Sequence, residues 1–145
     1  MRRFNITIGQ CMTTNVHTLD VKKFVSDAAK MLREKKVGSI IIIEGKDAIG
    51  IITERDIVYK VVAEGKDAKK IPLKGIMSKP LKTLKAEQTV HEAALAMRQS
   101  NIKRLPVLDK KGKLVGIITE SDLMSVYPGI IDIMTESPHM RNDKD

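Results

Sequence analysis

The sequence predicts an α/β fold built from two similar repeats, each with the order strand, helix, strand, strand, helix. The first observation is a heptapeptide: residues 50–56 are Gly-Ile-Ile-Thr-Glu-Arg-Asp, and residues 116–122 differ from them only in having Ser in place of Arg. The second is a matching opening, Met-Thr at residues 12–13 and Met-Ser at residues 77–78. Internal repetition of this kind predicts two copies of one supersecondary unit.

The elements of the first repeat follow from the spacing of its apolar residues, which alternate in strands and recur every three or four positions in helices. The predicted elements are a short strand over 16–19, a helix over 24–36, a hairpin of two strands over 39–44 and 48–53, and a helix over 55–64. Ahead of them, the alternating Ile6 and Ile8 predict a weak strand or a lead-in arm.

The second repeat has the same order of predicted elements. They are a short strand at 83–84, a helix from 90, a hairpin of strands over 104–109 and 114–119, and a helix over 121–126. Thr89, with Glu92 three positions later, forms a capping-box pattern that marks the start of the first of these helices. Pro128 and Gly129 stop the second helix.

These patterns predict two domains, at residues 8–65 and 76–134. The segment 66–75 between them is polar and basic and contains a proline and a glycine, so we expect a linker there. The polar residues 135–145 predict a flexible C-terminal tail.

A chain of 145 residues makes one compact domain, or two very small ones that share a core. Because each repeat leaves one face of its sheet in need of cover, we expect the repeats to pack sheet to sheet about an approximate twofold axis. The two heptapeptides would then face a shared cleft, which is a common place for a ligand.

Each heptapeptide joins the end of a strand to the start of a helix and carries a hydroxyl and a carboxylate there, Thr53 with Asp56 and Thr119 with Asp122. One interpretation is purely structural, because both pairs fit a capping box. The other is a binding site, because the free N–H groups at a helix start attract phosphate. A carboxylate beside them can accept hydrogen bonds from both hydroxyls of a ribose. The residues alone leave both interpretations open.

Composition restricts the partners and the compartment. Lys and Arg number 26 against 18 Asp and Glu, so the net charge of +8 favours anionic partners. Nucleic acid is one such partner, but the scarcity of aromatic residues, 3% of the chain, and the lack of a recognisable recognition helix disfavour it.

The single cysteine, Cys11, excludes an internal disulfide and suits a reducing compartment. The longest aliphatic run, 40–43, is too short for a membrane span and no signal peptide is recognisable, so we expect a cytoplasmic protein without a membrane partner.

The sequence contains no recognisable catalytic motif. His91 and Glu92 begin like the metalloprotease pattern H-E-x-x-H, but Leu95 replaces the second histidine. Neither a phosphate-binding P-loop nor a nucleophile elbow is present. We therefore expect no enzyme activity, no catalytic residues, no metal site and no required cofactor.

The duplicated unit, its Met-Thr/Ser opening and the heptapeptide resemble the cystathionine β-synthase (CBS) domain, and two such units in tandem resemble a Bateman module. The resemblance covers residues 8–134. It implies a mixed sheet flanked by helices, no chemistry of its own, and regulatory binding of an adenosine-containing ligand. AMP, ADP or ATP is the expected ligand, and S-adenosylmethionine is less favoured. The resemblance also implies a homodimer that acts on a regulated protein.

The resemblance further implies roles for the residues of the heptapeptides. Asp56 and Asp122 would hold ribose hydroxyls, with Thr53 and Thr119 on the phosphate side. Arg55 would reach the phosphate of the ligand that Asp122 holds.

Lys103, Arg104 and Pro106 lie in a basic-basic-apolar-Pro-Val segment that is similar to one in nucleotide-binding members, so both cations are expected to meet phosphate. The first repeat has a glycine and a serine at this place, which removes both charges. We therefore expect the Asp122 site to bind a charged adenine nucleotide more tightly than the Asp56 site. The alternative within the same fold is a structural subunit whose pockets stay empty.

Overall fold

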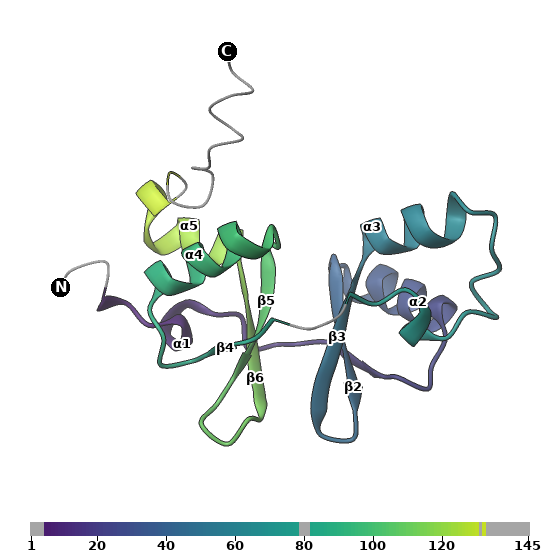
Figure 1. Ribbon diagram of the computed structural model, residues 1–145, viewed down its shortest axis with the longest axis horizontal. Coiled ribbons are helices and arrows are strands. Elements are labelled where there is room, and N and C mark those ends of the chain that lie inside the picture. Colours follow the sequence, from purple (N-terminus) through teal and green to yellow (C-terminus); the bar gives the residue numbers. More distant parts are fainter. Residues whose placement is uncertain (1–4, 79–81, 131, 133–145) are drawn as a thin grey trace, which may run out of the picture. The chain divides into compact units, whose positions relative to one another are not determined.

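The computed structural model describes residues 5–78, 82–130 and 132, which are coloured in Figure 1. The chain divides into two compact units: the first is residues 16–81, and the second combines residues 1–15 with residues 82–145. The predicted tail at the C-terminal end lies outside the described residues.

The first unit contains a three-stranded mixed sheet with the order β1-β2-β3. β1 (Thr18–Asp20) runs parallel to β2 (Ser39–Glu44), which forms an antiparallel hairpin with β3 (Asp47–Thr53). α2 (Val25–Lys35) connects β1 to β2, and α3 (Glu54–Ile57) follows β3. Figure 1 shows α2 and α3 on the same side of the hairpin. The predicted α/β element order is confirmed.

Isoleucine supplies much of the first unit's core, because a β-branched side chain fits the pleated surface of a strand. Ile40 and Ile42 of β2 belong to one apolar cluster with Ile52 of β3 and with Val25 and Ala28 of α2. All five side chains are buried. Burial of one such large aliphatic side chain contributes about 1.5–3 kcal/mol relative to its exposure, so this cluster holds α2 against the sheet.

Residues 66–75, which were predicted to be a linker, pack onto the first unit. The N–H of Val25 donates to the carbonyl of Ile71 over 2.9 Å, which ties the segment to the start of α2. A 3-10 turn follows at Leu73–Gly75. The side chain of Leu73 is fully buried in the same apolar cluster, so part of this segment contributes to the core.

The second unit repeats the topology, with the sheet order β4-β5-β6. β4 (Leu84–Lys85) is parallel to β5 (Arg104–Leu108), and β5 pairs antiparallel with β6 (Leu114–Thr119). α4 (Val90–Ser100) connects β4 to β5, and α5 (Glu120–Val126) follows β6. The core again consists of apolar residues from the strands and from both helices.

The opening segment of each repeat packs in the unit that holds the strands of the other repeat. Thr13 exchanges both backbone hydrogen bonds with Ile117 of β6, each 2.9 Å long. Ser78 donates its N–H to the carbonyl of Ile51 in β3 over 3.1 Å. The compact units therefore do not coincide with the sequence repeats.

A short helix forms where the alternation of Ile6 and Ile8 predicted a strand or an arm. This helix is α1 (Ile8–Cys11). Thr7 is its N-cap, and the N–H of Thr7 donates to Oε1 of Gln10 over 2.8 Å. Because this cap satisfies the backbone at the helix start, the chain turns here instead of extending.

The helix predicted over 55–64 is wrong in one detail. It is α-helical only as far as Ile57, and residues Val58–Val62 then form a π-helix, in which the N–H of Ala63 donates to the carbonyl of Val58 over 2.8 Å. The equivalent helix of the second unit, α5, stays α-helical through Val126.

Candidate functional site

Thr53 and Asp56 form the corner at which β3 meets α3. Oγ1 of Thr53 accepts the N–H of Asp56 over 3.2 Å, and Oδ2 of Asp56 accepts the N–H of Thr53 over 2.9 Å. The Thr53 hydroxyl also donates to Oδ2 over 3.1 Å. The predicted capping box is therefore confirmed, and it fixes a carboxylate whose side chain is only 14% exposed.

Thr119 and Asp122 form the same corner in the second unit, between β6 and α5. Oγ1 of Thr119 accepts the N–H of Asp122 over 3.1 Å, and Oδ2 of Asp122 accepts the N–H of Thr119 over 2.9 Å. This capping box is likewise confirmed. Both carboxylates are half-buried and held in one orientation, as a positioned ligand-binding group must be.

The two carboxylates differ in the partner they take beyond the capping box. In the first unit, Nζ of Lys60 lies 3.1 Å from Oδ1 of Asp56 and donates to the carbonyl of Ile76 over 2.9 Å. In the second unit, the hydroxyl of Thr13 donates to Asp122, 3.2 Å from Oδ1 and 3.4 Å from Oδ2. One carboxylate therefore carries an ion pair, and the other a hydrogen bond from a neutral group.

Neither of these partners was predicted from the sequence. Lys60 lies four positions after Asp56, a spacing that places two side chains on one face of a helix. This signal was available, but it does not distinguish an ion pair from a solvated lysine. Thr13 had no local signal, because it lies 109 positions from Asp122.

The structure brings Lys103 and Arg104 to the corner that holds Asp122. Arg104 is the register partner of Thr119 across β5 and β6. The carbonyl of Lys103 accepts the N–H of Glu120 over 3.0 Å, and Nζ of Lys103 lies 4.0 Å from Oε2 of Glu120. Two cations therefore lie close to the capping box of the second unit.

The first unit has the same backbone arrangement at its corner but lacks the two cations. Pro106 is buried in β5 and pairs with Ile117. In the first unit, Ser39 is the register partner of Thr53, and the carbonyl of Gly38 accepts the N–H of Glu54 over 3.2 Å. The backbone is the same, but the two cations are replaced by uncharged residues.

Arg55 is exposed at the start of α3. Its guanidinium carbon lies 4.8 Å from the ring centroid of Tyr59, one helical turn later, in a cation–π arrangement. Such a contact at an exposed position contributes about 0.5–1 kcal/mol, so Arg55 can leave it for a phosphate at small cost. Its expected role at the ligand held by Asp122 stays a prediction.

Cys11 is the titratable neighbour of Asp122. Burial, and secondly the negative charge of Asp122, raise the pKa of the Cys11 thiol above its usual value. Its Sγ lies 3.8 Å from the carbonyl oxygen of Thr7, to which the thiol donates. At neutral pH the thiol is therefore protonated, which makes it a poor nucleophile and a poor metal ligand.

Within residues 5–78, 82–130 and 132, no three His, Cys, Asp or Glu side chains are grouped so that they could hold a metal ion. Within the same ranges, no helix is long and apolar enough to cross a membrane.

Comparison with known proteins agrees with this architecture. An uncharacterized protein of Methanopyrus kandleri is 37% identical over 133 residues, which are 91% of this chain and 68% of that protein. The hexameric CBS-CP12 protein from bloom-forming cyanobacteria matches with a TM-score of 0.76 and 32% identity, covering 95% of this chain and 79% of that one.

A third similar structure contains bound ligands. The CBS domain pair of protein MJ0100, in complex with 5′-methylthioadenosine and S-adenosyl-L-methionine, matches with a TM-score of 0.75 and 26% identity, covering 85% of this chain and 96% of that one. The sequence model of the CBS domain matches residues 8–63 and again residues 73–129. The resemblance found in the heptapeptides is therefore confirmed, and the chain belongs to the CBS domain family as a tandem pair.

Proposed function

We propose that this chain is a non-enzymatic regulatory module that binds an adenosine-containing ligand, with AMP, ADP or ATP as the preferred class. CBS domain pairs are regulatory, non-catalytic modules, and the similar pair of MJ0100 holds two adenosine derivatives. The observation that carries the proposal is the corner of the second unit. There a half-buried carboxylate, Asp122, lies at a corner with two consecutive cations: Lys103, which directly precedes β5, and Arg104, which is its first residue.

Each group of that corner has a role that its chemistry allows. Asp122 would accept hydrogen bonds from ribose hydroxyls, one of which would replace the hydroxyl of Thr13. Lys103 and Arg104 would neutralise phosphate, and the planar guanidinium of Arg104 can bind two phosphate oxygens at once. Thr119 would orient the carboxylate through the capping box.

The remaining predicted residues extend the proposal to the first unit. Thr53 and Asp56 would form a second corner of the same kind, and Arg55 would supply a further cation to a phosphate. Pro106, buried in β5, would stiffen the strand that carries Arg104.

The charge of the chain favours a nucleotide over S-adenosylmethionine. The net charge is +8, and the cations near the corners would repel the sulfonium of S-adenosylmethionine but attract phosphates. We therefore expect the order of affinity to follow the negative charge of the ligand. High salt should weaken ATP binding more than adenosine binding, because salt screens only the charged contacts.

Thermal unfolding of the chain with adenosine, AMP, ADP, ATP, 5′-methylthioadenosine and S-adenosylmethionine tests this function. A ligand present at 100 times its Kd stabilises the folded state by about 2.7 kcal/mol, which is readily measured as a rise in Tm. Asp122→Ala should remove most of the rise, and Lys103→Ala should reduce it more for ATP than for adenosine. No rise with any adenine compound would contradict the proposal, and strongly salt-dependent binding to DNA or RNA would favour the nucleic-acid alternative instead.

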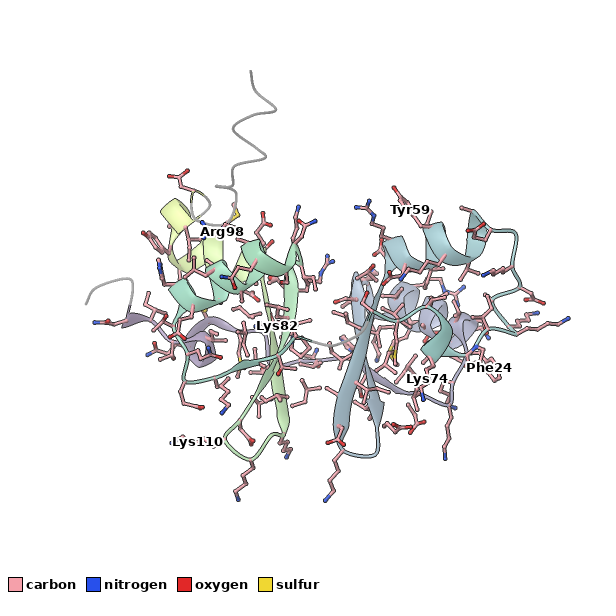
Figure 2. The ribbon with its side chains drawn as sticks, in the orientation of Figure 1. Phe24, Tyr59, Lys74, Lys82, Arg98 and Lys110 are labelled. Atoms are coloured by element: carbon pink, nitrogen blue, oxygen red, sulfur yellow. The ribbon has the colours of Figure 1, made fainter. Side chains whose placement is uncertain are left out.

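We also propose that the chain acts as a homodimer and that it acts on a regulated protein. A module without chemistry of its own can do so only through a surface that contacts another chain. Val58, Tyr59 and Val62 are 50%, 59% and 67% exposed on one short helical segment, and Figure 2 shows Tyr59 on the outer side of its helix. Exposed apolar clusters are typical of interaction surfaces. Tyr59→Lys should shift the sedimentation coefficient to that of a monomer, whereas Lys66→Glu, a charge change on a neighbouring exposed turn, should not.

A further inference from the structure

We propose that Lys60 is an internal competitor of the ligand: its ammonium group occupies the Asp56 carboxylate and makes the first corner a weaker ribose site than the second. This inference rests on the proposed function, because it concerns the same two corners. According to this inference, one residue outside the heptapeptide, Lys60, causes the difference in affinity between the Asp56 corner and the Asp122 corner.

The contacts of Asp56 leave little room for a ribose hydroxyl. Nζ of Lys60 lies 3.1 Å from Oδ1, while Oδ2 already accepts the N–H and the hydroxyl of Thr53 over 2.9 and 3.1 Å. A carboxylate offers about four acceptor positions, so three of them are in use. The side chain of Asp56 is only 14% exposed, so few other directions are open for a hydroxyl to approach its carboxylate.

A second contact holds Lys60 in this position. The same ammonium donates to the carbonyl of Ile76 over 2.9 Å, so two acceptors fix it at once. A ribose hydroxyl that is to reach Oδ1 of Asp56 must therefore separate an ion pair or share the oxygen with it. Separation of an ion pair costs more than exchange of one neutral hydroxyl for another.

The second unit provides the matched comparison inside the same chain. The residue four positions after Asp122 is Val126, which is half-buried against the core of the second unit and carries no charge. The carboxylate of Asp122 instead accepts the hydroxyl of Thr13, over 3.2 and 3.4 Å. A ribose hydroxyl can replace that neutral donor without separating charges, so the second corner is open to a nucleoside.

The experiment uses adenosine as the probe, because it has the ribose and no phosphate that would itself be attracted to Lys60. Calorimetric titration is made on the full chain carrying Asp122→Ala, in which only the first corner can bind through its carboxylate. Adding Lys60→Met to this background keeps the aliphatic stem but removes the charge. We expect the affinity for adenosine to rise about two- to fivefold, the range set by a partly exposed ion pair. Lys60→Gln is a second variant with the same expectation.

The reverse change is made in the second unit, in a chain carrying Asp56→Ala. Val126→Lys should place an ammonium four positions after Asp122 and lower the affinity for adenosine by a similar factor. Val126→Met, which matches the lysine stem without its charge, should leave the affinity unchanged. Circular dichroism and the Tm of each variant without ligand show whether it is folded.

The outcomes separate this inference from the proposed function. If neither the natural chain nor any variant binds adenosine or AMP, the proposed function fails and the inference fails with it. If the natural chain binds, but Lys60→Met and Lys60→Gln in the Asp122→Ala background bind equally or more weakly than that background, only the role of Lys60 is overturned. Weaker binding by Val126→Lys but not by Val126→Met would support it from the other corner.

Discussion

The sulfur of Met77 lies so close to Gly50 that a β-carbon at residue 50 would be 2.5 Å from Sδ. The second unit has the same relationship between Met12 and Gly116, with a distance of 2.6 Å. The first residue of each heptapeptide must therefore be glycine, because any side chain there would overlap the methionine of the opening segment. This packing accounts for the repeated glycine without any ligand.

Gly50→Ala should lower the free energy of unfolding by about 1–3 kcal/mol, as expected for an overpacked core. Urea unfolding measures the loss. Because most of the overlap is with the flexible side chain of Met77, the double variant Gly50→Ala with Met77→Ala should be more stable than the sum of the two single losses predicts. Strict additivity would show that the contact with Met77 is not the cause.

Gly116→Ala should cost more than Gly50→Ala, because its β-carbon would also lie 2.9 Å from the backbone carbonyl oxygen of Thr13. Backbone cannot move aside as a methionine side chain can. Met12→Ala should therefore rescue Gly116→Ala only in part. Equal rescue in both units, measured by the same urea titrations, would contradict this account.

Lys36 and Asn101 end the long helices of the two units in the left-handed conformation, with φ of 56° and 54°. This conformation costs a residue with a β-carbon about 1–2 kcal/mol, and asparagine tolerates it better than lysine. Glycine relieves the strain but loses more backbone entropy on folding. Lys36→Gly should therefore raise the stability by about 0.5–1 kcal/mol, and Asn101→Gly by less.

The matched control for Lys36→Gly is Lys35→Gly, one residue earlier and inside α2. Glycine within a helix costs about 0.5–1 kcal/mol relative to alanine, so this change should be destabilising. If Lys36→Gly raises the Tm and Lys35→Gly lowers it, the effect comes from the backbone conformation of Lys36. If both changes move the Tm in the same direction, the left-handed conformation is not the cause.

The elements that could be predicted from sequence are those fixed by local patterns. The hairpin of β2 and β3 follows from a β-branched run, a Gly-containing turn and a second apolar run, and both capping boxes need only a threonine and an acid three positions later. The start of α1 was missed because a cap at Thr7 outweighed the alternation of Ile6 and Ile8.

The exchange of the opening segments could not be predicted. Both segments carry methionine followed by a small hydroxyl residue, and both heptapeptides begin with glycine, so either methionine fits either glycine. No local signal states which pairing forms. The partners of the two carboxylates could not be predicted for related reasons. Thr13 reaches Asp122 only through that exchange, and Lys60 is held beside Asp56 by the carbonyl of Ile76, whose position depends on the folded chain.

Glu92 should contribute stability that depends on pH. A hydrogen bond from the side chain of Gln88, and secondly one from the backbone of Thr89, lower the pKa of Glu92 below 4.5. Because the folded-state pKa is lower than the unfolded one, the contribution is present above pH 4.5 and is lost as the pH falls through the folded-state pKa. The difference in free energy of unfolding between the natural chain and the Glu92→Gln variant should therefore become smaller as the pH falls below 4.5.

Unfolding free energies of both proteins, measured from neutral pH downwards, check this prediction. Glu87→Gln, a change at an exposed position of the preceding turn, serves as the control for general loss of negative charge. A difference between Glu92→Gln and the natural chain that is constant with pH would contradict the role of these hydrogen bonds.

Cys11 should report on the charge of Asp122. The pKa of its thiol is raised first by burial and second by the carboxylate of Asp122, so Asp122→Asn removes the second cause and leaves the first. The pKa should fall but stay above that of a free thiol, and alkylation of Cys11 at a fixed mildly alkaline pH should become faster because the thiolate fraction rises.

The control must separate charge from access. Thr13→Val removes the hydroxyl that Asp122 accepts but keeps the carboxylate charge, so it should change the alkylation rate without lowering the apparent pKa. A pH profile of alkylation distinguishes the two, because opening of the site raises the rate at every pH while loss of the charge moves the midpoint. If Asp122→Asn leaves the midpoint where it was, the carboxylate does not act on the thiol, and burial alone sets the pKa of Cys11.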